Sequence, residues 1–161
     1  MSAKRTSAKE TRPAPRSLEE LVAVAELQGV TFIEVTGCRP DFEGVTPVKT
    51  SREEGDSEPH MKVWHRAGDG QIEVRCRLTI GTADSRFVAD AVAQFAIAAA
   101  LPEEEELQRA FTERVGIAVV YPYLRESVQQ LAQKLDVDVP VLSLIAHKLT
   151  GLQLNTDTTE A

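Results

Sequence analysis

Residues 86–97 read Arg-Phe-Val-Ala-Asp-Ala-Val-Ala-Gln-Phe-Ala-Ile, and the fold class depends on whether these residues form a strand or a helix. Its alanine content favours a helix, because alanine has the highest helix propensity. Its larger apolar residues and alternate alanines nevertheless share one face at a period of two: Phe87, Ala89, Ala91, Ala93, Phe95 and Ile97. We therefore predict a strand, with Val88, Asp90 and Val92 on its opposite face, pointing to solvent.

The residues before this stretch predict the partners of the strand. Residues 72–80 alternate apolar and polar side chains, which is typical of a strand with one buried face. The turn Ala67-Gly-Asp-Gly70 joins them to a second extended run over residues 60–66. A β-branched and aromatic run over residues 30–36 predicts the first strand. Short turns between neighbours favour antiparallel pairing.

Helix signals lie at both ends of these strands. Ser17 with Glu20 three residues later is typical of a helix N-cap. Pro102 and the carboxylates of Glu103 to Glu106 predict the start of a second helix. A last helix is expected over residues 122–135, with Pro122 breaking whatever helix precedes it. The class is α+β: a four-stranded antiparallel sheet with two helices packed on one face, plus a short N-terminal helix.

The chain of 161 residues predicts one domain with loose ends. Residues 1–16 are basic and poor in apolar side chains, so we expect a disordered tail. The domain is expected over residues 17–150, and residues 151–161 are expected to form a flexible tail.

The net charge of −7 argues against nucleic acid and anionic membranes as partners, because their phosphates would repel the chain. No apolar run resembles a secretory signal or reaches the length of a membrane span. Cys38 and Cys76 have no zinc or redox spacing, which is typical of a reduced, cytoplasmic protein.

The sequence shows no recognisable catalytic or metal motif. His60 and His65 stand five apart in a predicted strand, so they point to opposite faces and cannot share a metal ion. We expect neither a metal nor a cofactor, and no enzyme activity. The alternative of another class is a small enzyme that uses His60 or His65 as a general base in a cleft between sheet and helices.

The segment Val120-Tyr-Pro-Tyr-Leu-Arg-Glu-Ser-Val128 resembles the Phe-Pro-Tyr-Ala-Arg-Glu start of the long helix in the SecB protein-export chaperones. Phe87-Val-Ala-Asp90 is similar to the Phe-Leu-Cys-Glu of that family's last strand. The order of elements also resembles the SecB fold over roughly residues 28–146. Glycines near the end of the family's last strand are absent here, and the acidic carboxyl tail is reduced to Asp157 and Glu160.

The resemblance implies an ATP-independent holdase that binds unfolded proteins for export or translocation, as a cytoplasmic homodimer or homotetramer. It implies a docking patch for the SecA motor at Glu34, Val88 and Asp90. The departures favour an alternative, a SecB-like chaperone dedicated to the antitoxin of a toxin-antitoxin system.

Client binding needs an extended apolar groove, which we expect between the sheet and the helices and continued across subunits. The candidate lining residues are the aromatic side chains Phe32, Trp64, Phe87, Phe95, Phe111, Tyr121 and Tyr123. Each of them can instead fill the core of one subunit.

Overall fold

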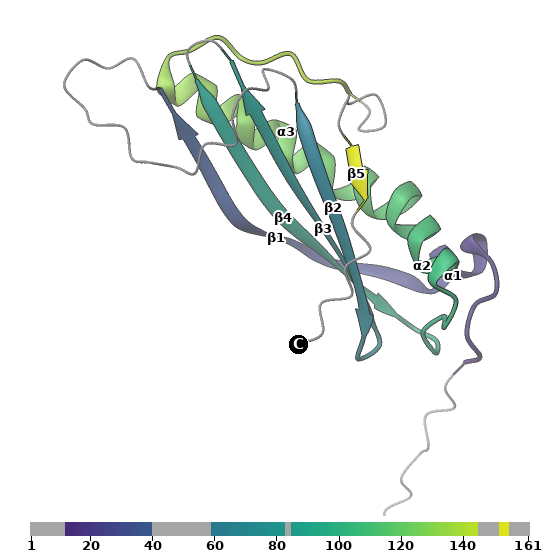
Figure 1. Cartoon of the computed structure of the whole chain (residues 1–161). Helices are drawn as coiled ribbons and strands as arrows, with labels where there is room; N and C mark the ends of the chain where they lie inside the picture. Colours follow the sequence, from purple (N-terminus) through teal and green to yellow (C-terminus); the bar gives the residue numbers. More distant parts are fainter. Residues whose placement is uncertain (1–11, 40–58, 83–84, 145–151, 155–161) are drawn as a thin grey trace, which may run out of the picture.

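The computed structural model describes residues 12–39, 59–82, 85–144 and 152–154, the last range by its backbone alone. It forms a five-stranded sheet with strand order β1-β4-β3-β2-β5. Helices α2 and α3 lie on one face of this sheet, and α1 lies at one end of it (Figure 1). The elements in chain order are α1 (Leu18–Val24), β1 (Ala25–Cys38), β2 (His60–Gly68), β3 (Gln71–Gly81), β4 (Arg86–Ile97), α2 (Glu105–Phe111), the π-helical turn η1 (Thr112–Gly116), α3 (Ile117–Leu135) and β5 (Leu152–Leu154).

The alanine-rich stretch is strand β4, as its period of two predicts. It pairs antiparallel with β1 on one side and with β3 on the other. Its alanines at positions 89, 91 and 93 are fully buried on the face toward the helices. Small side chains there let α3 pack close to the middle of the sheet, so tertiary packing outweighs the helix propensity of alanine.

The prediction that Pro122 ends a helix is wrong. Residues from Glu105 to Leu135 are helical without interruption, through α2, η1 and α3, and Pro122 lies inside α3. Pro122 is exposed, and so is Ala118, whose carbonyl lacks the usual donor four residues later. Water can reach that carbonyl on the solvent side, which lowers the cost of the proline.

The core lies between the sheet and this long helical segment. Phe95 of β4 and Phe111 of α2 meet edge to face, with ring centroids 5.1 Å apart. Gly116 touches β3 so closely that an added Cβ would stand 2.5 Å from Cγ2 of Val74. The hydroxyl of Tyr121 donates to the carbonyl of Ser143 (2.6 Å), which ties the segment after α3 to the helix.

Both ends of the described chain contact the fold. The Ser17 hydroxyl accepts from the Glu20 amide, which confirms the predicted N-cap of α1. The Ala100 amide donates to the Arg12 carbonyl and Pro15 is buried, so the predicted tail of residues 1–16 reaches the fold with its last residues. Residues 1–11 lie outside the described part.

The flexible tail expected over residues 151–161 includes one described element. Leu152–Leu154 forms β5, which pairs parallel with Met61–Val63 at the edge of β2. The remaining tail residues lie outside the described part. Among the described residues, no helix is long and apolar enough to cross a membrane.

Candidate binding surfaces

The face of the sheet opposite α2 and α3, the outer face, carries a polar network across four strands. Its centre is Asp90 of β4, whose two carboxylate oxygens accept from Nε (2.9 Å) and Nη2 (2.7 Å) of Arg75. Arg77 donates from Nη1 to the same carboxylate (3.1 Å) and to Glu34 of β1 (2.6 Å). The Arg75 guanidinium also lies 5.1 Å from the centroid of the Trp64 ring. Strand register places all five side chains on this one face.

The sequence predicted Asp90 on the outer face, exposed to solvent as part of an acidic surface. Its face is as predicted, but its exposure is not. Asp90 has 0% of its surface exposed, because the arginine side chains of β3 cover it. Val88 is also buried, with 9% of its surface exposed. The Glu34 carboxylate, half-buried, shares the Arg77 guanidinium. The predicted patch of Glu34, Val88 and Asp90 therefore lies together on the outer face, but its carboxylates are paired with arginines.

Pairing with carboxylates stabilises the charged form of these arginines. The hydrogen bond to Asp90 raises the pKa of Arg75 above its ordinary value, against the desolvation by burial. Desolvation opposes the charge of Arg77, but its hydrogen bonds to Glu34 and Asp90 raise the pKa of that group overall. The bidentate geometry at Asp90 holds Arg75 in one orientation.

The aromatic residues predicted to line a groove are divided among three places. Phe87, Phe95, Phe111 and Tyr121 are buried in the core. Trp64 lies on the outer face of the sheet, and not between the sheet and the helices. Phe32 of β1 and Tyr123 of α3 are exposed.

Strand β1 carries an uncovered apolar strip, which we define as Leu27, Phe32, Ile33 and Val35. These side chains are between 39% and 53% exposed. Leu27, Phe32 and Val35 pair with inward-facing residues of β4, so they lie on the helix side of the sheet. Ile33 is the extra residue at a register shift, where β1 bulges. This β1 strip lies at the edge of the sheet, since β1 pairs only with β4 among the described strands.

A second apolar surface follows α3. Val139, Val141 and Leu144 are exposed, Val141 to 95%. The segment runs from the end of α3 across the ends of the strands toward β5 (Figure 1). Val137 and Leu142 of the same segment pack against the core, so its backbone is anchored while its other apolar side chains face outward.

The histidines of the enzyme alternative lie apart. His60 belongs to the outer face, whereas His65 lies on the helix side beside Glu105 and Arg109 of α2. Burial lowers the pKa of His65 from 6.5. Cys76 is buried below the helices, and burial raises the pKa of its thiol to about 12. Among the described residues, no cluster of His, Cys, Asp and Glu has the geometry to hold a metal ion.

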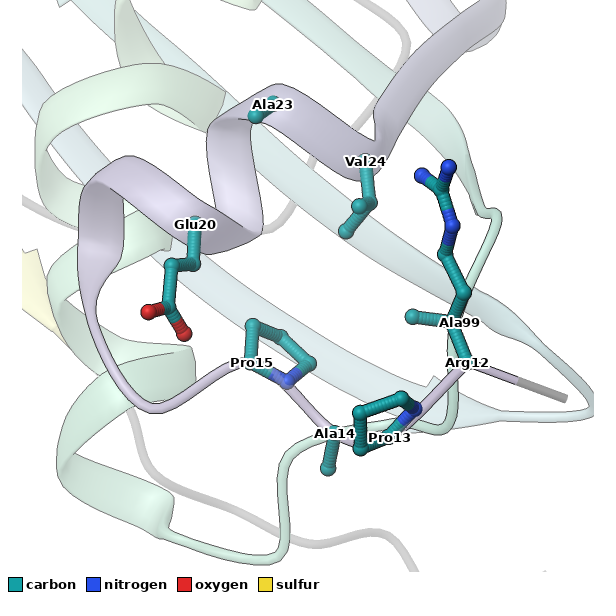
Figure 2. A pocket seen from close by; sticks show the side chains of 8 residues that line it. All are labelled: Arg12, Pro13, Ala14, Pro15, Glu20, Ala23, Val24 and Ala99. Atoms are coloured by element: carbon teal, nitrogen blue, oxygen red, sulfur yellow. The ribbon is translucent and has the colours of Figure 1, made fainter.

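A hollow of about 360 Å³ lies elsewhere, between the N-terminal lead-in and α1. Figure 2 shows Pro13, Ala14 and Pro15 forming one wall, with Glu20 at one end and Arg12 at the other. Ala23, Val24 and Ala99 complete it. It contains none of the predicted site residues and no side chain typical of a nucleophile.

Comparison with known proteins identifies the family to which the chain belongs. No family model matches the chain. The SecB-like chaperone SmegB of Mycolicibacterium smegmatis is 35% identical over 133 residues, which are 83% of this chain and 84% of SmegB. The chain therefore belongs to the SecB-like chaperones.

A solved structure confirms the fold. The Mycobacterium tuberculosis Rv1957 SecB-like chaperone, in complex with a ChAD peptide from the Rv1956 HigA1 antitoxin, matches with a TM-score of 0.59. The match covers 80% of this chain and 92% of that chain at 16% identity. The antiparallel sheet with helices on one face, expected from the sequence, is thus the SecB-like fold.

Two features of these surfaces were missed from the sequence. The β1 strip begins at Leu27, before the run at residues 30–36 that marked the strand, so its length was underestimated. The pairing of Asp90 was detectable, because Arg75 and Arg77 alternate on the same face of the neighbouring strand. Only the register between β3 and β4 brings them to this carboxylate.

Proposed function

We propose that this protein is a holdase that binds unfolded polypeptide without ATP and without a cofactor. The observation that carries the proposal is the β1 strip in a member of the SecB-like chaperones. Apolar side chains left uncovered beside a folded core mark a surface for another chain. Because burial of apolar area is non-directional, such a strip accepts clients of many sequences.

The edge of β1 supports assembly into a homodimer or homotetramer. A strand of 14 residues with a free edge and exposed apolar side chains is a template for pairing. If two β1 edges pair, Leu27, Phe32 and Val35 of both copies line a trough on the helix side of the joined sheet. This trough is the groove continued across subunits that the sequence predicts.

The test is suppression of aggregation. A chemically denatured client is diluted into buffer without nucleotide, and light scattering is followed with increasing amounts of this protein. The proposal predicts that scattering falls in proportion to the chaperone added, and native mass spectrometry should show a dimer or tetramer carrying client. A monomer that leaves scattering unchanged would contradict the proposal.

The second candidate is a chaperone dedicated to an antitoxin. It is favoured by one observation, the antitoxin peptide in the structure of the Rv1957 chaperone. Protection of several unrelated denatured proteins supports the general holdase, whereas protection of one antitoxin alone supports the dedicated chaperone. Export or translocation of the held clients and engagement of a SecA motor belong to the general proposal, with a cytoplasmic location as their setting.

A further inference from the structure

We propose that the outer face of the sheet docks an extended acidic segment of a partner protein, with Arg75 and Arg77 receiving its carboxylates. The docking site is separate from the β1 strip, and it does not depend on client holding. Its exposed arginines are also opposite in charge to the acidic motor patch that the family resemblance implies.

Two arginines of the outer face are more exposed than the carboxylates with which they pair, although the whole chain is acidic. Asp90 has no exposed surface, and the side chain of Glu73 is 24% exposed. The arginine that pairs with Glu73, Arg66, has 73% of its side chain exposed, and Arg75 has 41%. Asp90 and Glu73 thus lie beneath guanidinium groups, whereas the Glu34 side chain is 38% exposed beside Arg77 at 33%. An approaching partner therefore meets cations first at Arg66 and Arg75.

The arginines retain hydrogen-bond donors for a partner. Arg75 uses Nε and Nη2 for Asp90, and Arg77 uses Nη1 for Asp90 and Glu34. Within the described residues, Nη1 of Arg75 and both Nε and Nη2 of Arg77 make no hydrogen bond. A guanidinium has five N–H donors, so both groups can bind a second carboxylate while keeping the first.

Both guanidinium groups are held in place before a partner arrives. The Trp64 ring and the Asp90 carboxylate fix Arg75, while Asp90 and Glu34 fix Arg77. A partner therefore loses little free energy in ordering these side chains. The half-buried Trp64 adds an aromatic surface beside the charges.

The spacing of the two arginines matches an extended chain. Arg75 and Arg77 stand two residues apart on β3 and share one face. At about 3.3 Å per residue, their backbone positions are about 7 Å apart. An extended partner with Asp or Glu at alternate positions repeats its carboxylates at the same distance.

Two other occupants fit less well. A basic segment would meet the exposed guanidinium groups and be repelled. The net charge of −7 opposes any anionic partner, and it opposes a nucleic acid more strongly than a short acidic segment, because a nucleic acid carries a phosphate charge at every nucleotide.

The experiment measures binding of labelled synthetic peptides to the full-length protein by fluorescence anisotropy. The probes are a peptide of alternating Glu and Ser, its counterpart of alternating Lys and Ser, and a single-stranded oligonucleotide. We expect the Glu peptide to bind most tightly and to weaken as salt rises from about 50 mM to about 300 mM. Equal or tighter binding of the Lys peptide or the oligonucleotide, or no binding of the Glu peptide, would overturn the proposal.

The variant is Arg77→Gln, because Arg75 still pairs with Asp90 through two hydrogen bonds and the fold should be kept. The matched control is Arg109→Gln on α2, which removes one arginine from an ion pair with Glu113 on the helical layer. Arg77→Gln should weaken the Glu peptide roughly tenfold, the effect of one lost charge-assisted hydrogen bond, and Arg109→Gln should leave it unchanged. Equal effects of the two variants would overturn the proposal.

A second variant keeps the proposal testable if Arg77→Gln does not fold. Arg66→Gln lies at the exposed rim of the outer face and should weaken the same peptide by a smaller factor. Suppression of client aggregation, measured on the same samples, should not change in any variant. Loss of peptide binding with intact client protection separates this proposal from the holdase function.

Discussion

Asp90 is a carboxylate with no exposed surface on the face of the sheet opposite the helices. A buried charge is tolerated only when its partners satisfy it, and Arg75 and Arg77 supply three hydrogen bonds. Removing the Asp90 carboxylate leaves two neighbouring guanidinium groups without the anion that they share. At the residue scale, this group is the most sensitive position of the outer face.

We expect Asp90→Ala to lower the free energy of unfolding by about 2–3 kcal/mol, the range for hydrogen bonds to charged groups. Urea denaturation followed by circular dichroism measures it. Glu113→Ala is the control, because its ion pair with Arg109 is exposed and should contribute at most about 0.5 kcal/mol. Equal losses in the two variants would mean that burial of the Asp90 network adds no stability.

Gly116 stands where η1 meets β3. Its absent Cβ would lie 2.5 Å and 2.8 Å from the two methyl carbons of Val74, so Gly116→Ala should destabilise the protein by about 1–3 kcal/mol. This outcome opposes the gain of about 1 kcal/mol that alanine brings to an ordinary helix. Thermal unfolding of Gly116→Ala, of Val74→Ala and of the double variant tests the cause. The loss in the double variant should be smaller than the sum of the two single losses, and strict additivity would contradict the steric account.

His65 gives stability a pH dependence. Burial lowers its pKa in the folded protein below 6.5, with Glu105 raising it and Arg109 lowering it. The unfolded chain therefore takes up a proton at higher pH than the folded one, and stability is lost as pH falls below about 6.5. His65→Gln should lose less stability than wild type between about pH 7.5 and about pH 5.5. Parallel pH curves for the two proteins would contradict this assignment.

Among the elements, the strands, the start of α1 and the end of α3 could be predicted from the sequence, whereas the helical course between α2 and α3 could not. The alternation in residues 72–80 and 86–97 predicted β3 and β4 because one face of each is buried. The continuous helix through Pro122 could not be predicted, because its tolerance depends on which side of α3 meets solvent. The bulges of β1 could not be predicted either, since they are defined by the register with β4.

The edge of β1 decides self-association in our account. Ile33→Lys places a charge at the exposed bulge, and charges on an edge strand disfavour pairing with another strand. We expect a shift from dimer or tetramer to monomer in native mass spectrometry. Val141→Lys is the control, because Val141 is almost fully exposed outside the sheet. A shift in both variants, or in neither, would contradict pairing through β1.

At the scale of the whole molecule, one sheet separates two surfaces of different chemistry. The helix side is apolar at the β1 strip, while the outer side carries an ordered network of arginines paired with carboxylates. The sequence predicted the SecB-like fold through the Tyr-Pro-Tyr segment and β4, and the relatives confirm it. It could not predict which charged side chains of the outer face remain exposed, because pairing between strands decides this.

Whether the β1 strip holds clients is measured by the dissociation constant of a labelled unfolded client, determined without nucleotide. We compare wild type with Leu27→Ser plus Val35→Ser in the β1 strip, and with Val139→Ser plus Val141→Ser as a control of equal polarity change. The account predicts tight binding by wild type and by the control, and binding weakened about tenfold or more by the strip variant, because roughly 1 kcal/mol of apolar contact is lost at each position. Unchanged binding by a folded strip variant would contradict it.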